Sequence, residues 1–135
     1  MKHLSFILVV VFLSSCSKDF YVSYQSNAER TGKVVILPSE PTSQTTVTLD
    51  DNIIIKSKNV KSLTIDNVPE GEVKINYVSN NSTYKDKLNQ EMFVNVINGK
   101  ETTQLIQTPP RSTGYWIYSG LGGLVALYLL FLSPK

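Results

Sequence analysis

The sequence is poor in the residue types that most often carry catalytic chemistry or covalent cross-links. Its 135 residues include one cysteine and one histidine. A single cysteine cannot form a disulfide within the chain. Charged residues make up 18% of the sequence, the formal net charge is +2, and lysine and arginine form no dense block. The chain therefore lacks the basic footprint that is typical of a nucleic-acid-binding protein.

The N-terminal end has the three-part pattern of a secretory signal. Residues 1–3 give a positive start, residues 4–13 form an apolar run too short to span a bilayer, and small residues precede the cysteine. The quartet Leu13-Ser14-Ser15-Cys16 resembles the lipobox of bacterial lipoproteins. This resemblance implies that residues 1–15 are a lipoprotein signal peptide, cut off before Cys16, and that Cys16 carries the lipid, with palmitate as one acyl chain. An ordinary secretory signal followed by an incidental cysteine is the alternative.

Little catalytic chemistry remains once the signal is removed and Cys16 is acylated. His3 leaves with the signal, so histidine-based catalysis, thiolate catalysis and zinc sites of the Cys/His type have no residues to use. No Gly-rich phosphate loop is present. Asp50 and Asp51 could supply two ligands to a calcium site, but without further spaced acids a turn is the favoured interpretation. We therefore predict that the protein is not an enzyme and uses no cofactor or metal.

Residues 32–107 have the pattern of a mainly β domain. Short alternating or β-branched segments are separated by turn residues at intervals of about 8–12 positions. The clearest is the run in which Val73, Ile75 and Tyr77 alternate with polar residues. We expect a small antiparallel β-sandwich with Tyr77 packed in its core.

The strongest turn signal in this domain is Asn98-Gly99. Both central residues of a type I′ hairpin turn need a positive φ, which Asn and Gly adopt at low cost. A two-residue turn would pair residues 92–97 with residues 100–106. The inward face of that hairpin would then carry Met92, Val94, Val96 and Leu105.

Residues 47–77 resemble the small β-sandwich repeats of surface-layer and carboxypeptidase-regulatory type, including PEGA-like modules. The likeness rests on a strand, a polar turn, a second strand and the turn Val68-Pro69-Glu70-Gly71, which opens a third strand. The Gly-Tyr ending of that family is missing after Tyr77. The resemblance implies a sandwich fold and a non-catalytic role.

The C-terminal end carries the second membrane signal. Residues 108–114 are a proline-containing linker, and residues 115–132 contain no charged side chain. At about 1.5 Å per residue this run reaches about 27 Å, close to the hydrocarbon core of about 30 Å, and aromatic residues gather at its start. We predict a transmembrane helix over 115–132 and a cytoplasmic tail at 133–135.

Four small residues fall on one face of this predicted helix, namely Ser119, Gly122, Gly123 and Ala126. Small residues let the backbones of membrane helices approach closely, so this face is a candidate packing surface for a partner helix or a second copy. Glycine is also common in membrane helices that use no such surface, which leaves the two interpretations open.

Together, these signals predict a β domain in the periplasm, attached by lipid through a tether at 16–31 and by the C-terminal helix. A short edge strand is expected near the start of the tether. We expect a membrane-anchored bacterial lipoprotein that serves as a non-catalytic accessory or assembly subunit of a cell-envelope complex. Its expected partners are the bilayer and a membrane protein or second copy, and the helix favours the inner over the outer membrane.

Two other functions fit the sequence less well. A cell-envelope module that binds glycan or peptide could use the polar loop at 79–90, with Tyr84 as the candidate surface residue. A secreted eukaryotic protein could instead carry a GPI signal over 115–132, cleaved near 112–114, but this leaves Cys16 unexplained.

Overall fold

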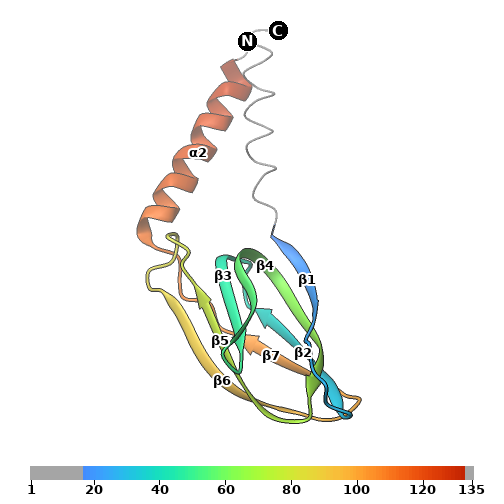
Figure 1. Cartoon of the computed structure of the whole chain (residues 1–135). Helices are drawn as coiled ribbons and strands as arrows, with labels where there is room; N and C mark the ends of the chain where they lie inside the picture. Colours follow the sequence, from blue (N-terminus) through green and yellow to red (C-terminus); the bar gives the residue numbers. More distant parts are fainter. Residues whose placement is uncertain (1–16, 133–135) are drawn as a thin grey trace.

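The computed structural model describes residues 17–132, apart from the side chains at 129, 130 and 132. The predicted signal peptide, the lipidation residue Cys16 and the predicted tail at 133–135 lie outside this range. Seven strands and then a helix follow one another along the described chain (Figure 1). They are β1 (Lys18–Ser23), β2 (Thr31–Pro38), β3 (Thr42–Leu49), β4 (Asn52–Pro69), β5 (Gly71–Ser79), β6 (Leu88–Val96), β7 (Glu101–Ile106) and α2 (Thr113–Leu132).

The strands form a mainly β domain, as predicted, but they belong to one continuous sheet. The strand order is β6-β5-β3-β4-β2-β7, and β1 pairs with β4 outside this path. Strand β4 links the two halves of the sheet because it is 18 residues long. Its first part pairs with β3 as far as Val60, and its second part pairs with both β2 and β1. The sheet therefore curls around the core (Figure 1).

Two strand pairs run parallel, which corrects the expectation of a purely antiparallel domain. β1 pairs with β4 from Lys18↔Val60 onward, and this strand is the edge strand expected near the start of the tether. β7 pairs with β2 from Lys33↔Glu101 onward. A parallel pair needs a long connection between its strands, so neither pair has a local signal in the sequence.

The hairpin predicted around Asn98-Gly99 is wrong in its pairing. β6 pairs with β5 along its whole length, and β7 pairs with β2. A turn is present with Gly99 at a φ of 68°, but Asn98 does not have the positive φ of a type I′ turn, and the turn connects the two opposite edges of the sheet. Its backbone is held by β2, because the Gly99 amide donates to the Thr31 carbonyl at 2.9 Å and the Lys33 amide donates to the Lys100 carbonyl at 2.9 Å.

This different pairing changes which side chains enter the core. Met92, Val94 and Val96 are buried, as predicted, because β6 keeps its alternation on β5. Leu105 points outward instead and is 62% exposed, while its neighbour Ile106 is fully buried. The parallel register on β2 therefore reverses the side of β7 that faces the core.

Tyr77 occupies the core, as the sequence predicts, and its hydroxyl is satisfied there. It contacts Thr42 Oγ1 at 2.5 Å, and Thr45 Oγ1 donates to the same Thr42 oxygen at 2.7 Å. All three residues are buried. Burial raises the pKa of Tyr77 above its ordinary value, although the two threonine hydroxyls act in the opposite direction.

Asp50 and Asp51 form the turn between β3 and β4. Both have positive φ angles, 45° and 68°. The Asp50 carboxylate accepts a hydrogen bond of 2.8 Å from the Lys74 amide, and the Asp50 amide donates to the Lys74 carbonyl at 2.9 Å. These contacts give Asp50 a role in joining the turn to β5.

Helix α2 runs away from the sheet and packs against none of its strands (Figure 1). Its large apolar side chains are exposed in the isolated chain, among them Trp116 at 64% and Leu124 at 65%. Within the described part of the chain, which omits three of this helix's side chains, no helix has the length and hydropathy needed to cross a membrane. The crossing predicted over 115–132 is therefore not supported by the described residues.

Candidate functional site at the junction of the β domain and helix α2

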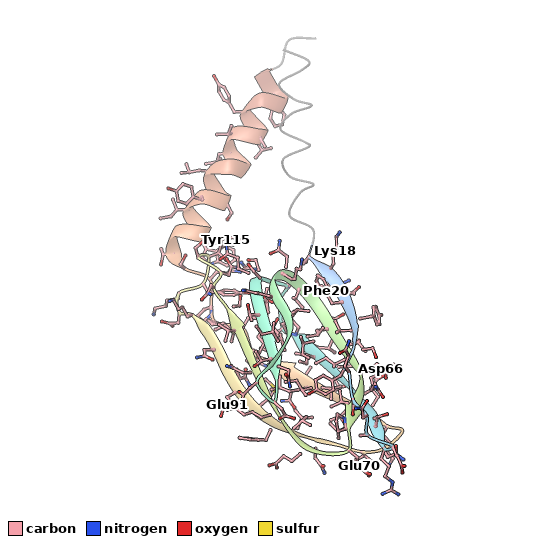
Figure 2. All side chains as sticks on the ribbon, viewed as in Figure 1. Lys18, Phe20, Asp66, Glu70, Glu91 and Tyr115 are labelled. Atoms are coloured by element: carbon pink, nitrogen blue, oxygen red, sulfur yellow. The ribbon has the colours of Figure 1, made fainter. Side chains whose placement is uncertain are left out.

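The two ends of the described chain leave the β domain at the same end. Lys18, which begins β1, and Tyr115, in the first turn of α2, are both at that end (Figure 2), while Asp66 and Glu70 lie toward the opposite end. Ser17 and Tyr115 line one hollow of about 290 Å³, together with residues from the β2–β3 and β5–β6 connections and Asn59 of β4. The residue that follows Cys16 is therefore adjacent to the base of the helix.

The linker between β7 and α2 is held against the connection between β5 and β6. Pro109 and Pro110 have no backbone N–H to donate, so β7 ends before them. The Lys85 amide donates to the Pro110 carbonyl at 3.0 Å, and the Ser112 amide donates to the Thr83 carbonyl at 2.8 Å. Tyr84 and Arg111 form an isolated antiparallel bridge between these two bonds. The linker is therefore an ordered part of the domain.

The Arg111 side chain is the centre of this junction. Its Nε and Nη2 atoms each lie 3.0 Å from the Glu40 Oε2 atom, and its Nη1 donates to Thr83 Oγ1 at 2.7 Å. Only 19% of the Arg111 side chain is exposed. Hydrogen bonds with an ionised partner are the stronger kind, particularly where water is partly excluded. One side chain thus ties the linker to the β2–β3 and β5–β6 connections.

Two tyrosine rings complete the surroundings of Arg111. Its guanidinium carbon lies 5.0 Å from the centroid of the Tyr84 ring and 4.8 Å from that of Tyr115. Both distances are within the range of cation–π contacts, which contribute from about 0.5 kcal/mol at exposed sites to about 2 kcal/mol when desolvated. Because Tyr115 belongs to α2 and Tyr84 to the domain, Arg111 joins the helix to the sheet.

Tyr84, the candidate surface residue for a ligand, is placed in this junction. It is only 5% exposed, and its hydroxyl donates to the Pro41 carbonyl at 3.4 Å. Burial raises the pKa of Tyr84, while the nearby Arg111 charge lowers it. The ring is covered by the linker, so it offers no open face to a glycan or peptide.

Ser112 begins the helix as its N-cap. The Tyr115 amide donates to the Ser112 carbonyl at 3.0 Å and lies 3.4 Å from the Ser112 hydroxyl oxygen. Capping by serine satisfies a backbone donor that the helix itself leaves free. The start of α2 is therefore fixed by the residue that directly follows Arg111.

The four small residues of the predicted packing face all lie on α2 and are exposed. The Ser119 hydroxyl donates to the Trp116 carbonyl at 3.3 Å, within the helix. A Cβ atom added at Gly122 or Gly123 would meet nothing within 4 Å. This face therefore makes no contact with the described part of its own chain.

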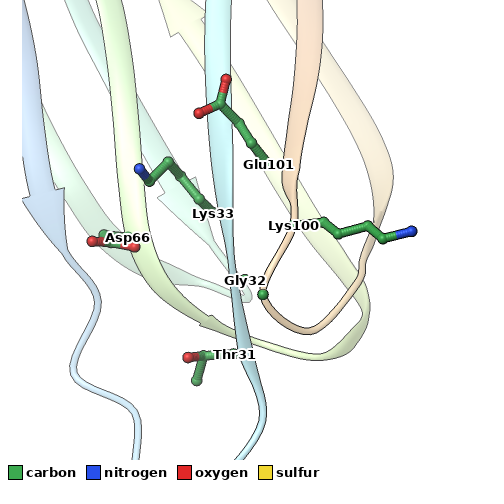
Figure 3. Close-up of a pocket in the computed structure, with 7 residues that line it drawn as sticks. Thr31, Gly32, Lys33, Asp66, Lys100 and Glu101 are labelled. Atoms are coloured by element: carbon green, nitrogen blue, oxygen red, sulfur yellow. The ribbon is translucent and has the colours of Figure 1, made fainter.

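A separate hollow of about 210 Å³ is shown in Figure 3, and its lining residue Asp66 lies toward the end of the domain away from α2 (Figure 2). Its wall includes Lys33, Asp66 and Glu101, beside the turn that contains Gly99. The lining has no histidine or cysteine, and its charges are of both signs.

The sequence singled out neither Glu40 nor Thr83, the two side chains that bind Arg111. Arg111 itself stands out in the sequence, because it is the last charged residue before a long uncharged run. Its partners do not stand out, since Glu40 lies 71 positions away in the sequence. Contacts of this kind depend on the strand order and cannot be inferred from local pattern.

The fold and this junction define a class of protein: a small mainly β domain joined through an ordered linker to one C-terminal helix. No known family model matches the chain, and no curated protein matches it either. Its function is therefore argued from its own residues.

Proposed function

We propose that this protein is a membrane-anchored bacterial lipoprotein whose β domain is a non-catalytic accessory or assembly subunit of a cell-envelope complex. The observation that carries the proposal is the exit of both chain ends at one end of the domain. Ser17 directly follows the proposed lipidation residue Cys16, and it lines the same hollow as Tyr115 of α2. Acyl chains on Cys16 and an inserted helix could therefore enter the same membrane without straining the domain.

The proposed role of α2 is to cross the bilayer. At about 1.5 Å per residue, its 20 residues reach about 30 Å, the thickness of a hydrocarbon core. No charged residue occurs between Arg111 and Lys135 in the sequence, and this uncharged run includes positions 129, 130 and 132. Trp116, Tyr118 and Leu121 are exposed, which is favourable in lipid and unfavourable in water.

The proposed partner surface is the small-residue face of α2. Gly122 and Gly123 contact nothing in the described part of the chain, so a second helix could approach their backbone closely. The junction at Arg111 would hold the β domain in a defined orientation relative to such a partner. A subunit with two attachments and a fixed orientation is suited to assembly, since it does not leave the membrane to act.

Membrane fractionation tests the proposal through each attachment separately. We expect wild type to carry acyl mass on an N-terminal Cys16 and to resist extraction with alkaline carbonate. Cys16→Ala should stay in the membrane through α2, and truncation after Pro110 should stay through its lipid. Only the combined variant should be soluble, because either attachment suffices to hold the chain.

Ser17→Ala is the matched control, since it leaves the quartet at 13–16 intact and should behave as wild type. An intact mass equal to that of the unmodified polypeptide would contradict lipidation. Release of Cys16→Ala into the carbonate supernatant would contradict insertion of the helix.

A further inference from the structure

The end of the β domain that carries the junction has an excess of free lysines. Lys18 follows Ser17 and Lys58 precedes Asn59, and both Ser17 and Asn59 line the hollow beside Tyr115. Lys61 follows Val60, the residue that pairs with Lys18. The Lys85 amide is bonded to the linker at Pro110, next to Arg111, which also lines the hollow. We call these residues, together with Lys87 in the same connection, the basic end: Lys18, Lys58, Lys61, Lys85 and Lys87.

The lysines of the basic end are exposed, and none of them forms an ion pair with a described residue. Arg111 differs, because its charge is matched by Glu40 within the junction. Two other acids lie near these lysines. Asp19 accepts a hydrogen bond of 2.6 Å from the Ser62 hydroxyl, and Asp86 lies between Lys85 and Lys87. The basic end therefore keeps an uncompensated positive charge.

The remote end of the domain has no such excess of positive charge. Asp66 and Glu70 lie there (Figure 2), and Asp66 shares the remote hollow with Glu101 (Figure 3). Lys33 and Lys100 line the same hollow, and Arg30 is paired with Glu70 at 3.3 Å, so the acids and bases there balance. Because the positive excess lies at the basic end and the charges at the remote end balance, the charge of the domain is distributed unevenly along its long dimension.

We propose that the basic end binds the anionic headgroups of the membrane into which the protein is anchored. This inference rests on the proposed function, since it requires that α2 and Cys16 hold this end against a bilayer. The attachments place the free lysines at the lipid surface, where each basic residue gains about 1 kcal/mol from an anionic leaflet. The remote end, which has no positive excess, is turned away from the same surface, so the uneven distribution of charge favours this orientation.

The test is lysine footprinting on the full mature chain in nanodiscs. The chain is acetylated by a soluble reagent in phosphatidylcholine discs and, separately, in discs that contain phosphatidylglycerol. Mass spectrometry then gives the acetylation rate of each lysine. A lysine that pairs with a headgroup is less accessible and less often deprotonated. We expect acetylation of Lys58, Lys61, Lys85 and Lys87 to be about fivefold slower in the anionic discs, as an interaction of this size implies. High salt should abolish the difference because it screens exposed charges.

Lys33 and Lys100 at the remote hollow are internal controls, and their rates should be the same in both kinds of disc. A matched pair of variants isolates the effect of charge. Lys58→Gln combined with Lys61→Gln should reduce the slowing at Lys85, whereas Lys33→Gln combined with Lys100→Gln should not change it. Equal rates at the basic end in the two discs, or slowing at Lys85 that the first variant leaves unchanged, would overturn the inference. Carbonate extraction of the same preparation distinguishes a failure of this inference from a failure of the proposed anchoring, because a chain that washes off contradicts the anchoring itself.

Discussion

Arg111 and Glu40 meet across 71 positions of sequence, with two guanidinium nitrogens each 3.0 Å from one carboxylate oxygen. Glu40 belongs to the connection between β2 and β3, and Arg111 is the last charged residue before α2. The contact therefore fixes the start of the helix against a connection of the sheet that is remote in sequence. An anchored domain with a flexible linker would not need such a contact, so the junction bears directly on how the protein is oriented.

Arg111→Lys should destabilise the junction although it keeps the charge. Lysine cannot supply the forked donors that reach both Glu40 and Thr83, and it lacks the planar group that lies over two tyrosine rings. We expect a loss of about 1–3 kcal/mol in the free energy of unfolding in detergent. Fluorescence of Trp116, the only tryptophan, should report the loosening of the helix base.

Arg30→Lys is the control, since its pair with Glu70 is largely solvated and its own side chain is 73% exposed. It should change stability by less than about 0.5 kcal/mol. Equal effects of the two substitutions would show that Arg111 acts as an ordinary surface charge.

Gly32→Ala should destabilise the closure between β2 and the β6–β7 turn. A Cβ atom at Gly32 would lie 2.6 Å from the Ile97 carbonyl oxygen and 2.7 Å from Val96 Cγ1. Both neighbours are held, one by backbone bonding and one by the core, so we expect a loss of about 1–3 kcal/mol. Chemical denaturation followed by circular dichroism measures it. Gly120→Ala, where an added Cβ meets nothing within 4 Å, should not destabilise the protein.

Leu105→Ala and Ile106→Ala together test the parallel register of β7. Leu105 is 62% exposed and Ile106 is fully buried. The first substitution should cost less than about 1 kcal/mol, and the second should cost about 2–5 kcal/mol through lost burial and a cavity. The reverse order in thermal denaturation would favour the hairpin pairing with β6, in which Leu105 faces the core.

Stability should fall at alkaline pH because of Tyr77. Burial raises the pKa of Tyr77 in the folded protein above its usual value of about 10. The unfolded chain therefore loses this proton first. The contribution of protonated Tyr77 to the free energy of unfolding is fully present below about pH 10. It is lost as the pH rises from there through the pKa of Tyr77 in the folded protein.

Tyr77→Phe should flatten this alkaline decline in the free energy of unfolding, while lowering stability at neutral pH by about 1 kcal/mol because Thr42 loses a partner. Tyr21→Phe is the control, since Tyr21 is 81% exposed, and it should leave the pH profile of wild type unchanged. If the stability of Tyr77→Phe declines at alkaline pH as that of wild type does, the decline is caused by groups other than Tyr77.

Gly123→Leu should reduce cross-linking of α2 to a neighbouring helix without releasing the protein from carbonate-washed membranes. The leucine side chain would block close approach at the small-residue face, while it adds apolar surface that favours lipid. Leu121→Ala, on the large-residue side of the helix, should leave cross-linking unchanged. If Gly123→Leu has the same cross-linking yield as wild type, the small-residue face is not a packing surface.

Local patterns in the sequence are enough to predict the kinds of elements, strands followed by one helix. Alternation of apolar and polar residues at Val73, Ile75 and Tyr77 shows a half-buried strand because successive side chains in a strand point to opposite faces. The same reasoning places Met92, Val94 and Val96 inward, whichever neighbour β6 has. The uncharged run at 115–132 likewise predicts a helix without reference to any other segment. These features depend on the local periodicity of apolar and polar residues, which can be read from a short segment alone.

Which strands are neighbours, and which residues surround Arg111, depends instead on the packing of the whole domain. The position of the turn at Asn98-Gly99 was predicted correctly, although its type was not. β7 nevertheless joins β2, because pairing depends on how the whole sheet closes and a turn specifies only the local change of direction. Glu40 reaches Arg111, and the free lysines gather at one end, because a curled sheet brings together connections that are remote in sequence. The local residue pattern predicts the conformation of a segment, but the neighbours of that segment depend on how all the other segments pack.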